Sequence, residues 1–272
     1  MEKMEAPSFS VIIPSHHRPR LLERALQSVL AQRPDIPRQI IVVADVSNPE
    51  SEAVCQRLLA PSDLYIRRAG APGPSASRNL GLDLATGRYI LFLDDDDAWQ
   101  EDFLAQLVAH EEIRLGRFVY VNPSSVVENR SEAEPRFISE RVLDYVGKLD
   151  EEIYIRNQIA LPCFVFPRET IGTARFDVYM RAYEDWDFAL QVLAHARTWP
   201  CHLPIQGVRV FEVRDDSTDR RGQSAAADGP MGTMDYLYVY HRHPAPNDKL
   251  RTIRSLMLRH MAQKLAIAAE VL

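Results

Sequence analysis

Four consecutive aspartates, Asp94 to Asp97, are the residues of this sequence best suited to chemistry. They directly follow the apolar run from Tyr89 to Leu93, which is typical of a buried strand. Four adjacent carboxylates repel one another unless a cation or a hydrogen-bonding ligand compensates their charge. Mg2+ and Mn2+ prefer carboxylate oxygen and commonly bridge to substrate phosphates. The block therefore predicts either a metal and phosphate site or a solvated acidic turn that also caps a helix starting near Trp99.

A second group of acids, Glu184-Asp185-Trp186-Asp187, opens a helix that we predict over residues 183–196. Acids in a first helical turn are common because they interact favourably with the helix dipole, so a purely structural role is one interpretation. The other is that one carboxylate acts as a general base and takes a proton from a hydroxyl group. Adjacent helical residues point about 100° apart, so Glu184 and Asp185 cannot play the same role.

The elements that must position these acids alternate along the first 93 residues. Apolar runs predict strands over 9–13, 39–43, 65–67 and 89–93, with helices between them, two of which cover 52–59 and 75–85. This rhythm favours a mainly parallel sheet with right-handed crossovers, whose ligand loops gather at one edge. Pro14, which we expect to end the first strand, Asp45 and Asp94 all fall at that edge. Asp45 could accept a hydrogen bond from a ribose or base, or cap the following turn.

Arg78 lies early in the predicted helix 75–85, just after the permissive sequence Gly73-Pro74. A helix N-terminus combined with a guanidinium group is a favourable seat for a diphosphate. The alternative is a structural ion pair between Arg78 and Asp94 or a neighbouring acid.

The second half of the chain is less regular. Short strands are predicted over 118–121, 164–166 and 208–213, whereas 122–160 is hard to assign and 214–233 is disorder-prone. A last helix is predicted from Asp248 to the end, with a basic side and an apolar side. Such a helix either docks on anionic lipid or packs on its own domain or on a second copy. Its apolar side contains Leu250, Ile253, Met257, Met261, Leu265 and Leu272.

Bulk properties exclude several classes of protein. The chain has 272 residues and a net charge of -6, so it lacks the basic footprint of a nucleic-acid-binding domain. Three scattered cysteines predict a reducing compartment, with neither a disulfide framework nor a zinc site. Neither a signal peptide nor a transmembrane run is visible. We therefore expect a soluble, cytoplasmic protein.

Residues 73–97 carry a long, ordered motif. It runs from Gly-Pro through Ala-Ser-Arg-Asn-Leu-Gly and Ala-Thr-Gly to the strand that ends in the four aspartates. This sequence resembles the family 2 glycosyltransferases of the GT-A fold, and the resemblance extends over roughly residues 8–220. It implies an α/β fold, a Rossmann-like, mainly parallel sheet flanked by helices, with a C-terminal helical extension.

We expect a GT-A domain over residues 8–213, with a nucleotide-binding half at 8–120 and an acceptor half at 121–213. A flexible loop is expected over 214–233 and a helical extension over 234–272.

The resemblance also implies roles for individual residues. Asp96 would ligate Mn2+ or Mg2+ directly, and Asp94 would contact the ribose or the metal, while Asp97 could cap the next helix. Asp185 would be the general base, with Glu184 helping to orient the acceptor or the base. The expected nucleotide-binding residues are Pro14, Arg18, Asp45, Arg78, Asp94 and Asp95, while Asn79 and Gly81 would shape the turn after Arg78.

Several positions depart from the family pattern, among them His16 and His17 after the first strand. Ala44 replaces the first acid of the usual pair after the second strand, and Val46 replaces a glycine, so the base preference stays open. Arg214 occupies the place of a frequent histidine that precedes Ser217, which leaves a third protein ligand to the metal in doubt.

The expected activity is metal-dependent, inverting transfer of a sugar from a nucleotide diphosphate donor to an acceptor hydroxyl in polysaccharide biosynthesis. The acceptor could be a glycan, a lipid-linked sugar or a small molecule. One alternative is a sugar nucleotidyltransferase, although residues 14–20 lack the glycine-rich loop of that class. Another is a catalytically degenerate GT-A binding or assembly module. The C-terminal helix could add a peripheral membrane contact at the inner face or a homodimer interface.

Overall fold

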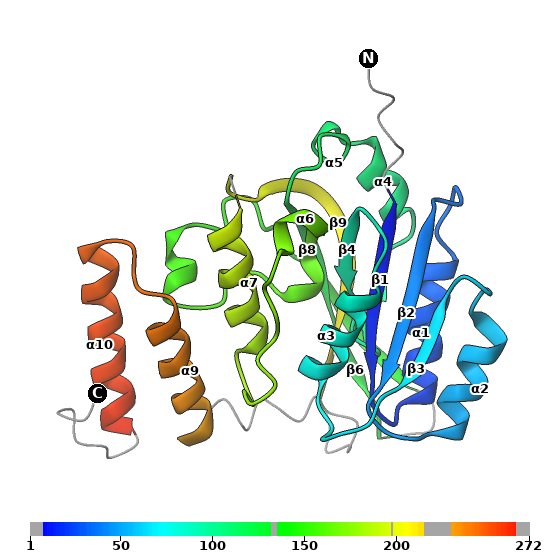
Figure 1. The fold of residues 1–272 in the computed structure, drawn as a ribbon, viewed down its shortest axis with the longest axis horizontal. Coiled ribbons are helices and arrows are strands. Elements are labelled where there is room, and N and C mark those ends of the chain that lie inside the picture. Colours follow the sequence, from blue (N-terminus) through cyan, green and yellow to red (C-terminus); the bar gives the residue numbers. More distant parts are fainter. Residues whose placement is uncertain (1–7, 132–134, 197, 215–229, 265–272) are drawn as a thin grey trace.

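The computed structural model describes residues 8–131, 135–196, 198–214 and 230–264. Within these ranges a nine-stranded sheet is flanked by helices (Figure 1). Eight strands follow the order β3-β2-β1-β4-β8-β6-β9-β5, and β7 pairs with β6. The core is therefore one continuous sheet on which both halves of the chain meet.

The first half forms the parallel part of this sheet. Its strands are β1 (Phe9–Ser15), β2 (Arg38–Ala44), β3 (Leu64–Arg67) and β4 (Tyr89–Phe92). The helices between them are α1 (Pro19–Leu30), α2 (Pro49–Leu58) and α3 (Pro74–Leu84). β2 and β4 both pair in parallel with β1, so the carboxyl ends of these strands lie at one edge. The predicted alternation of strands and helices is confirmed.

Two predicted boundaries at this edge are wrong. β1 continues through Pro14 to Ser15, with Pro14 opposite Val43 of β2. Because β4 pairs with β1 only as far as Ile12, the missing Pro14 N–H removes no ladder bond on the β4 side. Trp99 lies in the short strand β5 (Ala98–Trp99), and the next helix, α4 (Phe103–Ala109), begins later.

The second half makes the sheet mixed. β8 (Phe164–Pro167) is antiparallel to β4 and to β6 (Val119–Asn129), and β9 (Cys201–Val213) is parallel to β6. β5 is antiparallel to β9, and β7 (Arg136–Val142) is antiparallel to β6. β6 is much longer than the predicted strand 118–121 because buried polar residues interrupt its apolar pattern. One of them, Asn122, is satisfied by the amide of Tyr145 and by His202.

Several short helical elements cross this half. They are α5 (Glu111–Arg114), η1 (Glu151–Tyr154), η2 (Leu161–Cys163) and α6 (Arg168–Ile171). The longer helix α7 (Glu184–His195) is followed by α9 (Pro230–Arg242) and α10 (Asp248–Lys264), which lie beside it in Figure 1. Within the predicted loop 214–233, residues 215–229 lie outside the described part of the chain, and 230–233 already belong to α9.

The C-terminal helices pack on α7 through a second apolar cluster. Trp186 and Leu190 of α7 meet Tyr236, Val239 and Tyr240 of α9 there, and Met257 of α10 packs against them. Burial of these apolar side chains holds the two C-terminal helices against α7.

Part of the predicted basic side of α10 faces inward. Leu250 is buried, and the buried guanidinium of Arg254 donates to the backbone carbonyls of Tyr154, Tyr240 and His243. Membrane contact and dimerisation through this helix stay predictions, and the predicted apolar residues from Met261 onward lie beyond the described side chains. Among the helices that the structure describes, none combines the length and apolar character needed to span a bilayer.

Candidate functional site

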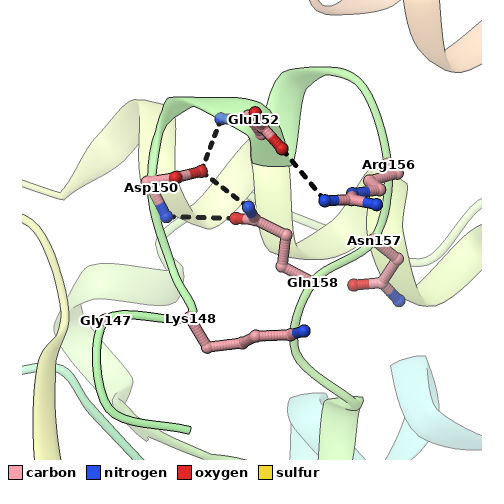
Figure 2. A pocket seen from close by; sticks show the side chains of 7 residues that line it. All are labelled: Gly147, Lys148, Asp150, Glu152, Arg156, Asn157 and Gln158. Carbon is pink, nitrogen blue, oxygen red and sulfur yellow. Dashed lines mark hydrogen bonds and ion pairs between the residues drawn. The ribbon is translucent and has the colours of Figure 1, made fainter.

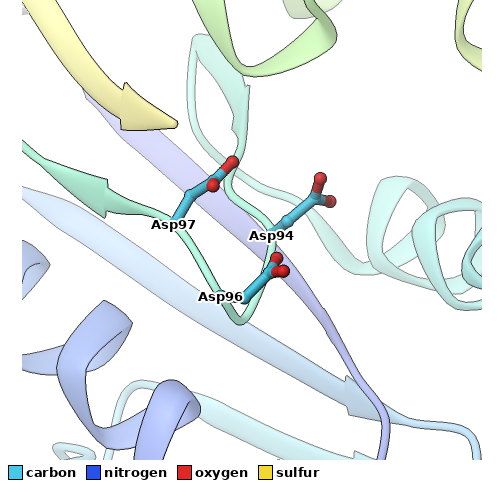
Figure 3. Close-up of side chains that lie close together, drawn as sticks. All are labelled: Asp94, Asp96 and Asp97. Carbon is cyan, nitrogen blue, oxygen red and sulfur yellow. The ribbon is translucent and has the colours of Figure 1, made fainter. Parts of the chain in front are cut away.

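Three of the four aspartates converge at the carboxyl end of β4. Oxygens of Asp94, Asp96 and Asp97 all lie within 4.8 Å of one another, and Figure 3 shows their carboxylates pointing to the same side of the turn. Such an all-oxygen set fits a hard divalent cation such as Mg2+ or Mn2+. Asp97 does not cap a helix as expected, because its Oδ1 accepts the amide of Phe211 in β9 at 3.0 Å. It is instead a third candidate ligand.

Asp95 points elsewhere and anchors the loop after β1. Its Oδ2 accepts the backbone amide of His16 at 3.0 Å, and its Oδ1 lies 2.5 Å from Arg18 Nη2. Burial raises the pKa of this carboxyl to about 7, although the charge of Arg18 acts in the opposite direction. The predicted nucleotide contacts of Arg18 and Asp95 stay predictions.

Arginines from three segments compensate the acids of this turn. Arg18 Nη1 and Arg130 Nη1 lie 3.2 and 3.5 Å from Asp96 Oδ2. Arg24 of α1 donates to the carbonyl of Asp96 at 2.7 Å and pairs with the buried Glu128, which also binds Arg130. Three of these residues were not identified from the sequence, because they lie outside the motif. Arg24 lies on α1, Glu128 lies in the part of β6 that was not predicted, and Arg130 directly follows β6.

Asp45 ties three loops together at the end of β2. Its carboxylate accepts the Gly73 amide at 2.7 Å, and its other oxygen lies 2.7 Å from His16 Nδ1. Both contacts are with residues distant in the sequence, so Asp45 does not cap the turn that follows it, and Asn48 caps α2 through the Ser51 amide. Asp45 therefore borders the loop that leads into α3, and its contact with a nucleotide stays a prediction.

The Arg-Asn-Leu-Gly part of the motif lies inside α3 and not in a turn. Asn79 exchanges two hydrogen bonds with the backbone of Phe176, at 2.8 and 2.9 Å. Gly81 faces β1 so closely that an added Cβ would lie 2.4 Å from Ile12 Cγ2. These two residues fix the position of the helix that carries Arg78.

Arg78 joins the two groups of acids that the sequence singled out. Its Nη2 donates to Asp94 Oδ1 at 2.8 Å, and its Nη1 donates to Glu184 Oε1 at 3.3 Å. The whole Arg78 residue is only 5% exposed. The structural ion pair considered as an alternative is thus present, and binding of a diphosphate by Arg78 stays a prediction.

Asp185 is held by both of its carboxylate oxygens. Oδ1 accepts the Trp186 amide at 2.7 Å, and Oδ2 accepts the side-chain amide of Asn157 at 2.9 Å. Burial raises the pKa of Asp185 above the usual range, while Arg78 acts against this. Burial and the neighbouring charge of Asp185 also raise the pKa of Glu184. The raised pKa makes Asp185 a better proton acceptor than an ordinary aspartate.

The start of α7 is fixed by α9. Asp235 Oδ2 accepts the backbone amides of Arg181 and Ala182, at 2.7 and 3.0 Å, immediately before Tyr183 turns with a φ of 62°. The buried Asp187, two residues after Asp185, binds Arg242 and His243 at 2.7 and 2.9 Å. The sequence feature that could have indicated this contact is Asp235, an acid within an otherwise apolar and aromatic segment.

Two further contacts complete the surroundings of the site. The Trp186 indole N–H donates to the carbonyl of Ile153 in η1 at 2.6 Å, which links α7 to the segment that carries Asn157. The Arg214 amide donates to the carbonyl of Glu128 at 3.2 Å. Ser217 lies outside the described residues.

A solved structure shares this fold. The crystal structure of Staphylococcus aureus TarS 1-349 in complex with UDP superposes with a TM-score of 0.58 at 15% identity. The match covers 94% of this chain and 72% of TarS. The α/β GT-A fold expected from the sequence is confirmed.

Sequence relatives point in the same direction. The chain is 25% identical to the putative colanic acid biosynthesis glycosyl transferase WcaA of Escherichia coli, over 89% of this chain and 84% of the relative. It is 28% identical to the GalNAc(5)-diNAcBac-PP-undecaprenol beta-1,3-glucosyltransferase of Campylobacter jejuni, with 63% of this chain matched, and spans 55% of that protein's length. The model of glycosyl transferase family 2 matches residues 10–163, more than half of the sequence. The chain therefore belongs to glycosyl transferase family 2.

Proposed function

We propose that this glycosyltransferase moves one sugar from a nucleoside diphosphate donor to an acceptor hydroxyl, with inversion at the anomeric carbon. One observation carries the proposal: Arg78 bridges Asp94, in the acid cluster of β4, and Glu184, next to Asp185 on α7. A donor site and a proton-accepting site are thereby held together by one buried cation.

The donor side would use the residues at the carboxyl ends of the parallel strands. Asp94, Asp96 and Asp97 would hold Mg2+ or Mn2+, and such an ion would stabilise the leaving diphosphate. Asp45 would accept a hydrogen bond from the nucleoside. Pro14 and Arg18, at and beyond the end of β1, would border the same nucleotide.

The acceptor side would use the first turn of α7. Asp185 takes the proton of the acceptor hydroxyl as its oxygen attacks the anomeric carbon. The bond from that carbon to the diphosphate breaks on the opposite face, so the configuration inverts. Glu184, paired with Arg78, orients this turn.

The names of relatives support a coarse assignment of substrate. WcaA is named for the biosynthesis of a polysaccharide, and the TarS structure contains UDP. We therefore propose a role in polysaccharide biosynthesis, with a uridine-linked sugar as the first donor to test. We also propose that the protein acts in the cytoplasm, with peripheral contact to the inner face of the membrane through its C-terminal helix.

Calorimetric titration of uridine, guanosine and deoxythymidine diphosphates, with and without Mn2+, tests the donor site. Metal-dependent binding of one nucleotide, lost in Asp96→Ala and kept in Asp83→Ala, is the expected result. Asp83 is a matched control because it is an exposed aspartate on α3 that pairs only with Arg175 among the described residues. If the folded protein binds none of the three, the proposal fails and the degenerate binding module is favoured.

A further inference from the structure

A polar pocket lies beside the predicted base. One short segment, residues 147–158, forms it, and its volume is about 280 Å³ (Figure 2). The lining consists of Gly147, Lys148, Asp150, Glu152, Arg156, Asn157 and Gln158. No apolar side chain contributes to this lining, so the pocket suits a ligand rich in hydroxyl groups. Its volume lies just below the range of about 300–1,000 Å³ that is typical of ligand pockets, which suits a single sugar unit.

The walls of this pocket are preformed by bonds within the segment. Gln158 Nε2 donates to Asp150 Oδ1 at 2.6 Å, and the Asp150 amide donates to Gln158 Oε1 at 3.1 Å. Arg156 pairs with Glu152 at 3.0 Å. These pairs, drawn in Figure 2, satisfy most of the polar side chains without a ligand.

Asn157 is one of two exceptions. Its Nδ2 donates to Asp185 Oδ2, whereas its Oδ1 is buried and accepts no hydrogen bond from any described residue. The amide cannot be turned over, because two oxygens would then face each other. A buried acceptor without a donor is destabilising, and a donor from a ligand would remove that cost. Figure 2 shows this oxygen directed toward Gln158, on the pocket side of Asn157.

Lys148 offers the complementary group. Its side chain lines the pocket below Asn157 and Gln158 in Figure 2, and its ammonium has no hydrogen-bond or ion-pair partner among the described residues. An ammonium group can donate to the hydroxyl or ring oxygens of a sugar.

We propose that this pocket is the acceptor subsite and binds one monosaccharide unit of a carbohydrate acceptor. Asn157 Oδ1 accepts a hydrogen bond from a hydroxyl of that sugar, and Lys148 donates to another of its oxygens. Because Asn157 also holds Asp185, it is a positioning residue that connects acceptor binding with the base. This assignment rests on the proposed function.

Amide NMR spectra of the full chain test the subsite, recorded with the nucleotide and metal that calorimetry identifies. The probes are methyl glycosides of glucose, galactose, N-acetylglucosamine and glucuronic acid, with hexanol as the apolar probe. At least one glycoside should shift the amide signals of residues 147–158 in a saturable way, and hexanol should not. Asn157→Ala and Lys148→Ala should each weaken that binding by about 2- to 10-fold, as expected for one hydrogen bond. Gln56→Ala, an exposed amide on α2, is the control and should bind like the wild type.

Three outcomes would overturn the subsite: shifts in the hexanol arm only, no saturable shift with any glycoside, or variants that bind a glycoside as tightly as the wild type. Nucleotide titrations of the same two variants separate this failure from failure of the donor site. Retained nucleotide binding without glycoside binding rejects the subsite alone, whereas a wild type that binds no nucleotide rejects the proposed function.

Discussion

The two sides of the proposed site, the donor side and the acceptor side, are built in different ways. On the donor side, Asp45, Asp94 and Asp96 follow parallel strands whose register fixes where each strand ends. On the acceptor side, Asp185 stands on the first turn of a helix whose position depends on contacts with η1 and α9. Strand ends are placed by the sheet itself, whereas the proposed base, Asp185, is placed by side chains from segments distant in the sequence.

The two sides also differ in electrostatics. Asp96 is surrounded by Arg18 and Arg130, which offset the repulsion among the aspartates. Asp185 has a neutral amide, Asn157, as its side-chain partner, and burial raises its pKa. A cluster of carboxylate oxygens suits a hard divalent cation, while a carboxylate with a raised pKa suits proton transfer.

The largest effect is expected from Asp185→Asn. The amide keeps the size of the side chain but cannot take a proton, so turnover should fall by about 10²- to 10⁴-fold. Release of nucleotide diphosphate from the donor measures turnover, and calorimetry should give an unchanged affinity for the nucleotide. The exposed Asp83→Asn is the matched control. Turnover at the wild-type rate in Asp185→Asn would contradict the assignment of the base.

A smaller effect is expected from Asp235→Ala, which tests whether α9 positions the base. The amides of Arg181 and Ala182 would lose their acceptor, at a cost of about 1–3 kcal/mol in the free energy of unfolding. A shift in the base of about 1 Å could reduce kcat by up to about 10²-fold. Thermal unfolding and nucleotide release are the measurements.

Asp235→Asn separates positioning from charge. Both amides donate to a single carboxylate oxygen, and an asparagine oxygen can replace it. We expect Asp235→Asn to restore most of kcat. If Asp235→Ala loses stability but keeps the wild-type kcat, α9 supports the fold without positioning the base.

The smallest effect is a shift in pH dependence. Because burial raises the pKa of Asp185, kcat should decline as the pH falls, with a midpoint above about 3.9, the value of an ordinary aspartate. The charged groups that act on Asp185 are Arg78, which lowers its pKa, and Asp94, which raises it. Arg78→Gln should therefore move the midpoint to higher pH. A wild-type midpoint at or below the ordinary value would show that Asp185 is not the group that titrates.

The difference between the two sides explains what the sequence could predict. Buried strands such as β2 and β4 are runs of apolar residues, and acids directly behind them could be assigned to one edge from the chain alone. The role of Gly81 was not predicted, because it was expected to shape a turn and instead lies where α3 approaches Ile12 of β1. The pair between Arg78 and Asp94 was among the alternatives, but the contacts of Arg24 and Arg130 with this turn could not be predicted, because these two arginines carry no motif.

On the acceptor side, local pattern was a poor guide. β6 contains buried polar residues such as Asn122 and Ser124, so its apolar periodicity is broken and its second half was missed. Residues 147–158 have no regular pattern either, and the role of Asn157 depends on its contact with Asp185 across 28 positions of sequence. Long-range side-chain pairs of this kind are set by tertiary packing and not by propensity.

The bond from the Trp186 indole to the carbonyl of Ile153 has a consequence for how specificity can evolve. It ties the backbone of the 147–158 segment to the helix that carries Asp185, and it uses no side chain of that segment. The side chains of Lys148, Glu152 and Arg156 can therefore be exchanged while the backbone that spaces them from the base stays in place. Descendants of one ancestral chain could acquire new acceptors by point mutation at these three positions and inherit the same chemistry unchanged.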